Sequence, residues 1–219
     1  MSTSAPQRST PTLAPLTPRL AAAPRPTDKA AALLDAALRL IAREGLHATP
    51  TAAIAREAGV AHGTLFLYFP TKEALFNALY LELLDETRRV TSAVHPLTAD
   101  RSADPKERLW PTWHALARWH LDRPEVFQVM QQLRGSGILT AKTRAAEQRV
   151  RAANLRRLRA AIADGSLRKL TPRVFTALYN GPMQVLAEAN GKDGAKDVSD
   201  AELRATFEGV CRAVLPAGA

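Results

Sequence analysis

The chain has 219 residues, of which 46% are hydrophobic and 5% aromatic, and its formal net charge at pH 7 is +9. This size and composition suffice for one or two domains with a real core. The single cysteine, Cys211, excludes an intrachain disulfide and a cysteine-built zinc site, and it fits a reducing cytosol. No apolar run approaches the ~18 residues needed to span a membrane, and the positive charge suits a polyanionic partner. We therefore expect a cytoplasmic protein without a membrane partner.

Residues 1–26 hold six of the fifteen prolines and show no periodic apolar pattern. This composition predicts a disordered, proline-rich arm. Its arginines could reach a DNA minor groove, as the arms of some DNA-binding proteins do, but a solvated tail without a role is the simpler interpretation. The first helix is expected to start at Thr27, a plausible cap, and to end at Gly45.

A pair of short helices is predicted between residues 49 and 69. Thr49 can cap a helix whose first residue is Pro50, and Gly59 can end that helix in a left-handed conformation. A second short helix follows, roughly Ala61 to Phe69. Two short helices joined by a tight turn that contains glycine form a helix-turn-helix, and its second helix is the one that enters the major groove of DNA.

The rest of the chain is predicted to be helical as well. Pro70 stops the second short helix, and Thr71 can cap a helix from Lys72 to about Val90. Ser199 and Glu202 form a capping box for the last helix. The other expected helices are 106–122, a short one after Pro124, 139–163, 171–190 with a kink at Gly181-Pro182, and 200–215, and loops are expected at 95–105 and 191–199. No strand is apparent, so we expect an all-α fold of about nine helices.

The segment Thr27 to Thr87 resembles the tetracycline-repressor (TetR) family of bacterial transcription regulators. The residues that carry the resemblance are Ile54-Ala55, Ala58-Gly59-Val60, Gly63-Thr64-Leu65, Tyr68-Phe69-Pro70 and Lys72-Glu73-Ala74-Leu75, with Ala36, Leu40 and Gly45 upstream. The resemblance implies a three-helix DNA-binding domain at 27–87, with its motif at about 50–69 and a linking helix at 72–90. It also implies a C-terminal ligand-binding and dimerisation domain at 88–219.

The second short helix offers small polar side chains to base edges and phosphates. His62 and Thr64 can reach base edges, and Gly63 lets the backbone approach closely. Thr49 or Thr51, at the N-terminus of the preceding helix, can bind a phosphate. Tyr68 and Lys72 can hold the DNA backbone across the groove. The predicted DNA-binding residues are Thr49, Thr51, His62, Gly63, Thr64, Leu67, Tyr68 and Lys72. Phe66 departs from the family, which usually has tyrosine there, and this predicts the loss of one phosphate contact, worth about 0.5–1.5 kcal/mol.

The resemblance implies a small-molecule effector held inside the C-terminal domain. A largely apolar pocket with a few polar groups could be lined by Trp110, Trp113, His114, Phe127, Met130, Tyr179 and Met183, although ordinary core packing is the alternative for each. One reading helix covers only a few base pairs, so we expect a homodimer on a palindromic operator. The resemblance implies that the last two helices, 171–190 and 200–215, pair with their copies, although the sequence also fits two ordinary core helices.

We therefore expect a DNA-binding transcriptional regulator, and specifically a repressor that a small molecule releases from its operator. The alternative is a lipid- or metabolite-binding protein that keeps this fold without DNA binding. Neither paired carboxylates, nor a metal-spaced histidine cluster, nor a nucleophile elbow appears in the sequence, and the five histidines are scattered. We accordingly expect no enzyme activity, no catalytic residue, no metal and no cofactor.

Overall fold

The computed structural model of the chain describes residues 26–93, 104–189 and 197–216. The expected disordered arm, nearly all of the expected 95–105 loop and most of the 191–199 loop lie outside these residues. The nine helices of the described residues are α1 (Pro26–Glu44), α2 (Thr51–Glu57), α3 (His62–Tyr68), α4 (Lys72–Ala93), α5 (Pro105–Asp122), α6 (Pro124–Gly135), α7 (Ala141–Ala163), α8 (Pro172–Ala189) and α9 (Asp200–Val214). Within the described ranges the fold is all-α, as the sequence predicts, and it contains no helix that is both long and apolar enough to cross a membrane.

The helix ends follow local chemistry in most places. Gly45 has a φ of +87° after α1 and Gly59 a φ of +68° after α2, so both adopt the left-handed conformation that glycine tolerates. The capping box of Ser199 and Glu202 is present at the start of α9. α1 begins at Pro26, one residue before the expected cap, so Thr27 lies inside the helix. α4 runs to Ala93, three residues beyond the expected end.

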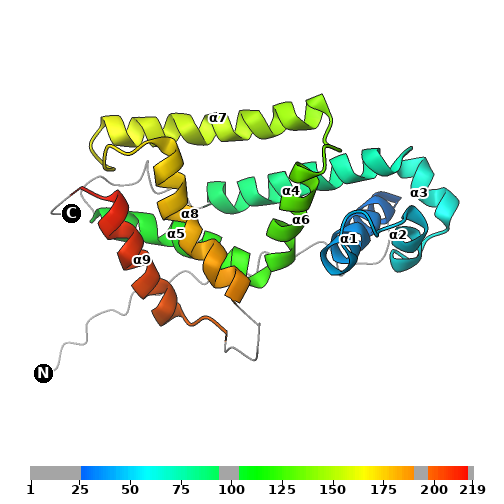
Figure 1. The fold of residues 1–219 in the computed structure, drawn as a ribbon, viewed down its shortest axis with the longest axis horizontal. Helices are drawn as coiled ribbons and strands as arrows, with labels where there is room; N and C mark the ends of the chain where they lie inside the picture. The colour runs from blue at the N-terminus through cyan, green and yellow to red at the C-terminus, as the bar shows by residue number, and fades with distance from the viewer. Residues whose placement is uncertain (1–25, 94–103, 190–196, 217–219) are drawn as a thin grey trace, which may run out of the picture.

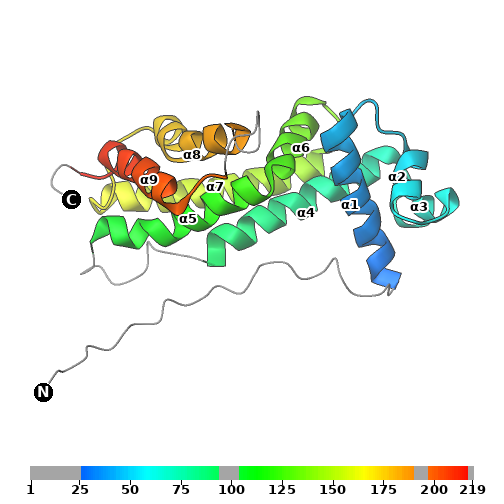
Figure 2. The same ribbon diagram turned by 90° about the horizontal axis from the view of Figure 1, so that it is seen from below.

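Two apolar cores divide the molecule. The first lies under α1, α2, α3, the first half of α4, and α6, with Leu33, Ile54 and Leu65 fully buried. The second joins the end of α4 to α5, the C-terminal part of α7, α8 and α9, around Trp113 and Phe207. Figures 1 and 2 both place α2 and α3 at one end of the molecule and the C-terminal end of α9 at the other.

α6 shares its core with the N-terminal helices, although it follows the linking helix in the chain. Its buried side chains Val126, Val129, Met130 and Leu133 all belong to the first core. The division of the chain at residue 87 stays a prediction, but the packing attaches one helix beyond that boundary to the N-terminal bundle. A change in α6 is therefore felt directly by α1 and α4.

Candidate nucleic-acid interface

The turn between α2 and α3 sets the angle at which the second helix stands. The backbone N–H of Val60 donates to the carbonyl of Ala55 (3.0 Å), and the N–H of Gly59 donates to the carbonyl of Arg56 (3.1 Å). Val60 is half-buried against the first core. Ile54 on α2 and Leu65 on α3 are fully buried, so both helices are fixed to α1 by apolar packing.

α3 presents its other side to solvent. His62, Gly63, Phe66 and Leu67 are exposed, and the exposed fraction of Leu67 reaches 83%. Nothing lies within 4 Å of the position that a Cβ would take at Gly63. A helix with one buried apolar side and a free small-residue surface at its N-terminal end can approach another molecule closely along that surface.

Thr49 does not have the role that its position suggests. Its side chain is fully buried, and its hydroxyl donates to the carbonyl of Gly45 (2.8 Å). The N-cap of α2 is Pro50, with Thr51 as the first helical residue, so the predicted cap at Thr49 is wrong. A fully buried hydroxyl cannot meet a phosphate, and of the two threonines considered for that contact only Thr51 is accessible.

His62 is held in a defined position by two neighbours. Its Nε2 lies 3.0 Å from Oγ1 of Thr51, and its ring meets the ring of Phe66 edge-on, with 5.1 Å between centroids. The imidazole is thereby oriented before any partner arrives, and its other nitrogen remains to face a base or a phosphate. Phe66 has no hydroxyl that could donate a hydrogen bond, but its ring packs against His62, which can donate one.

The first turn of α4 borders the exposed side of α3. The hydroxyl of Thr71 accepts from the backbone N–H of Ala74 (3.0 Å), which confirms the predicted cap. Backbone and Thr71 hydrogen bonds in this turn lower the pKa of Glu73. Lys72 is half-buried, and its Nζ lies 5.4 Å from the centroid of the Phe76 ring. Tyr68 is also half-buried at the end of α3. These contacts position one cation and one phenol beside the exposed side of α3.

Comparisons with known proteins agree with this geometry. The family model described as bacterial regulatory proteins of the tetR family matches residues 33–79, which include α2 and α3. A crystallised TetR family transcription regulator from Marinobacter aquaeolei VT8 superposes with a TM-score of 0.73 at 25% identity, covering 86% of this chain and 96% of that chain. A putative regulator of the family from Shewanella sp. PV-4 gives a TM-score of 0.67 at 28% identity, covering 85% and 97%. Residues 33–79 of the chain thus match the tetR family of bacterial regulatory proteins, and the chain has the fold of solved members of that family.

Curated relatives of the chain match it over about a quarter of its length. The fatty acid metabolism regulator protein of Bacillus subtilis (strain 168) is 41% identical over 54 residues, which are 25% of this chain and 28% of that protein. The HTH-type transcriptional regulator RutR of Escherichia coli (strain K12) is 44% identical over 57 residues, or 26% and 27% of the two chains. The chain thus matches little more than a quarter of the length of these relatives.

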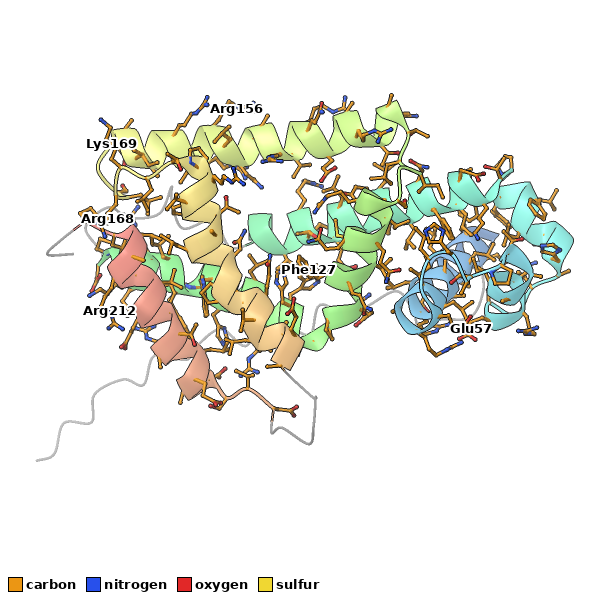
Figure 3. The ribbon with its side chains drawn as sticks, viewed as in Figure 1. Glu57, Phe127, Arg156, Arg168, Lys169 and Arg212 are labelled. Atoms are coloured by element: carbon orange, nitrogen blue, oxygen red, sulfur yellow. The ribbon has the colours of Figure 1, made fainter. Side chains whose placement is uncertain are left out.

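The seven residues predicted to line an effector pocket are spread over both cores and the surface of α5. Trp113 and Met183 are buried in the second core, and the indole N–H of Trp113 donates to the carbonyl of Tyr179 (3.1 Å). Met130 belongs to the first core, and Phe127, at the first turn of α6 in Figure 3, lies near His120. One pocket lined by all seven stays a prediction, and the packing places Met130 in a different core from Trp113 and Met183.

The remaining two predicted residues lie toward the surface between α5 and α9. Trp110 lies against His114, with 4.7 Å between ring centroids, and Nε2 of His114 is 3.0 Å from a carboxylate oxygen of Asp200. Hydrogen bonds from His114 and Arg118 lower the pKa of Asp200 to about 2. This group ties the N-terminal end of α9 to α5.

His120 was not singled out by the sequence. It is buried near the join of α5 and α6, its Nδ1 lies 2.8 Å from the carbonyl of Leu116, and burial lowers its pKa. Trp119 beside it packs against both cores and donates its indole N–H to Glu86 (3.0 Å). The apolar periodicity of α5 predicted a buried side at this position, but it did not predict that the two cores would meet there.

Two polar anchors hold the N-terminal bundle to the rest of the molecule. The side-chain oxygen of Gln132 accepts from the backbone N–H of Leu46 (2.9 Å), which joins α6 to the segment between α1 and α2. The side chain of Asn77 donates to the carbonyl of Ile138 (3.0 Å) and accepts from the N–H of Thr140 (2.8 Å). The position of the exposed side of α3 therefore depends on α6 and on the start of α7.

Proposed function

We propose that the protein is a transcriptional regulator that binds operator DNA by inserting α3 into the major groove. The observation that carries this proposal is the exposed side of α3, where oriented and small polar residues stand opposite the buried Leu65. The match to the tetR family supports the same conclusion. A major groove admits an α-helix and displays a distinct pattern of donors and acceptors for each base pair.

Each side chain has a role that its position favours. His62 and Thr64 read base edges, Gly63 lets the backbone come close, and Leu67 can meet the methyl group of a thymine. Thr51, Tyr68 and Lys72 lie at the borders of this surface and bind phosphates, which fixes register without reading sequence. Thr49 has no part in the contact because it is buried.

We further propose that two copies pair through α8 and α9, which would present two reading helices to a palindromic operator. Among the described residues, the large apolar side chains that are exposed are Phe66 and Leu67 on α3 and Val174, Leu178 and Val185 on α8. Three exposed apolar residues along one helix favour a partner of the same kind, since a two-fold axis would bring the same surface of each copy together.

A small-molecule effector would act by changing the separation of the two reading helices, and such a ligand would make the protein a releasable repressor. The meeting of the two cores at α5 supports this proposal, because Trp119 packs on both and Glu86 and Arg123 pair there (3.1 Å). A ligand that favours one arrangement of the cores would shift the population of DNA-binding dimers only by its differential affinity.

The test of DNA recognition is binding to the DNA immediately upstream of the protein's own reading frame, titrated against salt and random competitor DNA. Thr64→Ala should weaken binding to the operator more than binding to random DNA. Lys72→Ala should weaken both about equally and lower the salt slope by about 1. If both variants bind the operator as the parent does, α3 is not the reading helix. Weak binding by the parent that vanishes near physiological salt would favour the lipid- or metabolite-binding alternative.

The test of dimerisation is the mass in solution of Val185→Glu, measured by light scattering. The side chain of Val185 is 66% exposed in the single chain, so a charge there costs the fold little but would be buried in the proposed dimer. Gln184→Glu introduces the same charge on the preceding residue and serves as the control. A dimeric Val185→Glu protein that binds the operator normally would exclude this part of α8 from the interface.

A further inference from the structure

The positive charge of the molecule lies far from its reading helix. Residues 26–75, which contain α1, α2 and α3, carry five basic and five acidic side chains and therefore have no net charge. Residues 140–173 carry ten basic and two acidic side chains, a net charge of +8 out of the +9 of the whole chain. Electrostatic attraction to a polyanion must therefore come mainly from α7 and the segment after it.

The basic side chains of α7 are free in the described structure. Lys142, Arg144, Arg149, Arg151, Arg156, Arg157 and Arg159 are all exposed, and none of them has an ion pair or a side-chain hydrogen bond with another described residue. The one acidic residue of α7, Glu147, pairs with Arg134 of α6 (2.8 Å). Elsewhere arginines are neutralised, as Arg39 is by Asp35 and Glu57.

The cations are spaced regularly along the helix. Lys142, Arg149 and Arg156 follow one another at intervals of seven residues, so they share one side of α7 and extend over about 20 Å. The exposed residues between them are alanines, short polar residues and further arginines, which leaves the charges accessible. In Figure 1, α7 runs along one edge of the molecule, and Figure 3 places Arg156 on it and Lys169 in the segment that follows.

α7 lacks the exposed large apolar side chains of a membrane-binding helix or of an apolar protein interface. Its buried residues are limited to Thr143, Leu158 and Ala161, and none of the exposed large apolar side chains of the described residues lies on it. A helix that inserts into a lipid surface needs such side chains. Six of the seven cations are arginines, whose guanidinium groups bind phosphate oxygens in pairs. The regularly spaced cations of α7 are therefore suited to bind phosphates along a nucleic-acid backbone.

The start of α7 is fixed beside the reading head, defined as α1 to α3 and the first turn of α4. Asn77, five residues after Lys72, holds the backbone of Ile138 and Thr140 just before α7 begins. From there the helix runs away from α3 (Figure 1). DNA contacted by α7 is therefore a stretch other than the base pairs read by α3.

We propose that the exposed side of α7 is a second, sequence-independent binding surface for the phosphate backbone of duplex DNA. It adds affinity and salt dependence to the contribution of Lys72 in the reading head, which has no net charge. Because each neutralised phosphate releases condensed counterions, the surface contributes about 0.9 to the salt slope for every contact. The proposal goes beyond operator recognition and does not require an operator to be known.

The test compares two charge-matched variants of the full chain on a long duplex of random sequence over a range of NaCl concentrations. Arg149→Gln/Arg156→Gln removes two cations from α7. Lys106→Gln/Arg88→Gln removes two from α5 and α4. The α7 variant should lose on the order of tenfold in affinity, and its salt slope should fall by about 2, whereas the control should keep the parent slope. Thermal unfolding of both variants verifies that they are folded, and Arg149→Lys/Arg156→Lys should restore the slope.

Two results would overturn the proposal. If the α7 variant and the control have equal slopes on random DNA, the α7 cations are a solvated surface. If the same α7 variant weakens binding to polyglutamate or to anionic vesicles as strongly as to DNA, the surface is a general anion binder or serves an acidic protein or a membrane. Operator preference over random DNA is measured separately with Thr64→Ala, so the failure of either proposal is distinguishable from failure of the other.

Discussion

Thr51 and His62, the first residues of α2 and α3, are joined by a contact of 3.0 Å between Oγ1 and Nε2. The two residues are eleven apart in the chain, and the glycine turn between the helices brings them together. The hydroxyl thus orients an imidazole at the N-terminal end of the reading helix. A side chain that is ordered before binding loses less conformational entropy when it meets a base.

Replacing Thr51 by valine should therefore weaken operator binding while leaving the fold intact. Valine keeps the β-branched shape but removes the hydroxyl, and the expected loss is about 0.5–1.5 kcal/mol, the net contribution of one hydrogen bond. The measurement is the operator Kd, together with the unfolding midpoint. Thr87→Val on α4, which also removes a bonded hydroxyl, is the control and should keep the parent Kd. An unchanged Kd for Thr51→Val would mean that His62 does not need this partner.

Gly59 and Gly63 should respond to alanine in opposite ways. Gly59 has a φ of +68°, where a Cβ is strained, so Gly59→Ala should lower the free energy of unfolding by about 1–2 kcal/mol. Gly63 lies inside α3 with open space around it, so Gly63→Ala should stabilise the helix by up to about 1 kcal/mol. The same methyl group would keep DNA away, and Gly63→Ala should bind the operator more weakly. Denaturant unfolding and operator titration of both variants check this, and a Gly63→Ala protein that binds normally would contradict close backbone approach.

The sequence was most informative where the determining interaction is local. Gly45, Gly59 and the capping box at Ser199 were all predictable, because each depends on residues within one helical turn. Thr49 was misassigned because the carbonyl of Gly45 captures its hydroxyl and Pro50 occupies the cap position. Thr49 and Thr51 were equal candidates for a phosphate contact from the sequence, and the burial of Thr49 separates them.

The candidate effector residues show the other limit of sequence patterns. Periodicity places Met130 and Trp113 correctly on buried sides of their helices, but it does not say which core a buried side faces. α6 turns its apolar side toward α1 and α4, so Met130 is separated from Trp113. The free cations of α7 could be counted in the sequence, whereas their lack of acidic neighbours depends on tertiary structure.

Asn77 should be a stability determinant that also positions the reading head. It is buried and bonds to the backbone of Glu73, Ile138 and Thr140. Asn77→Ala removes the side-chain partner of the Ile138 carbonyl and of the Thr140 N–H, which should lower the free energy of unfolding by about 1–3 kcal/mol. The matched control is Asn154→Ala, at an exposed position of α7. Chemical denaturation of the two variants measures the difference, and equal stabilities would show that water replaces the lost bonds.

His120 should make the stability of the protein depend on pH in the mildly acidic range. Burial disfavours the charged imidazolium and lowers its pKa below the ordinary value of 6.5, and the Leu116 carbonyl only partly opposes this shift. The folded state then binds fewer protons than the unfolded state, so the stability is fully present above about pH 6.5 and falls as the pH decreases toward the lowered pKa. His120→Asn keeps a side-chain N–H near the Leu116 carbonyl but cannot titrate.

Unfolding midpoints measured from pH 7.5 down to about pH 5 should therefore fall more steeply for the parent than for His120→Asn. His47→Asn, which changes an exposed histidine, should keep the steep dependence of the parent. The difference between the two variants isolates the buried group from the general effect of acid on the carboxylates. If the parent and His120→Asn have parallel profiles, the imidazole is solvated well enough in the folded protein to be protonated there, and the join of α5 and α6 is more open to water than its burial indicates.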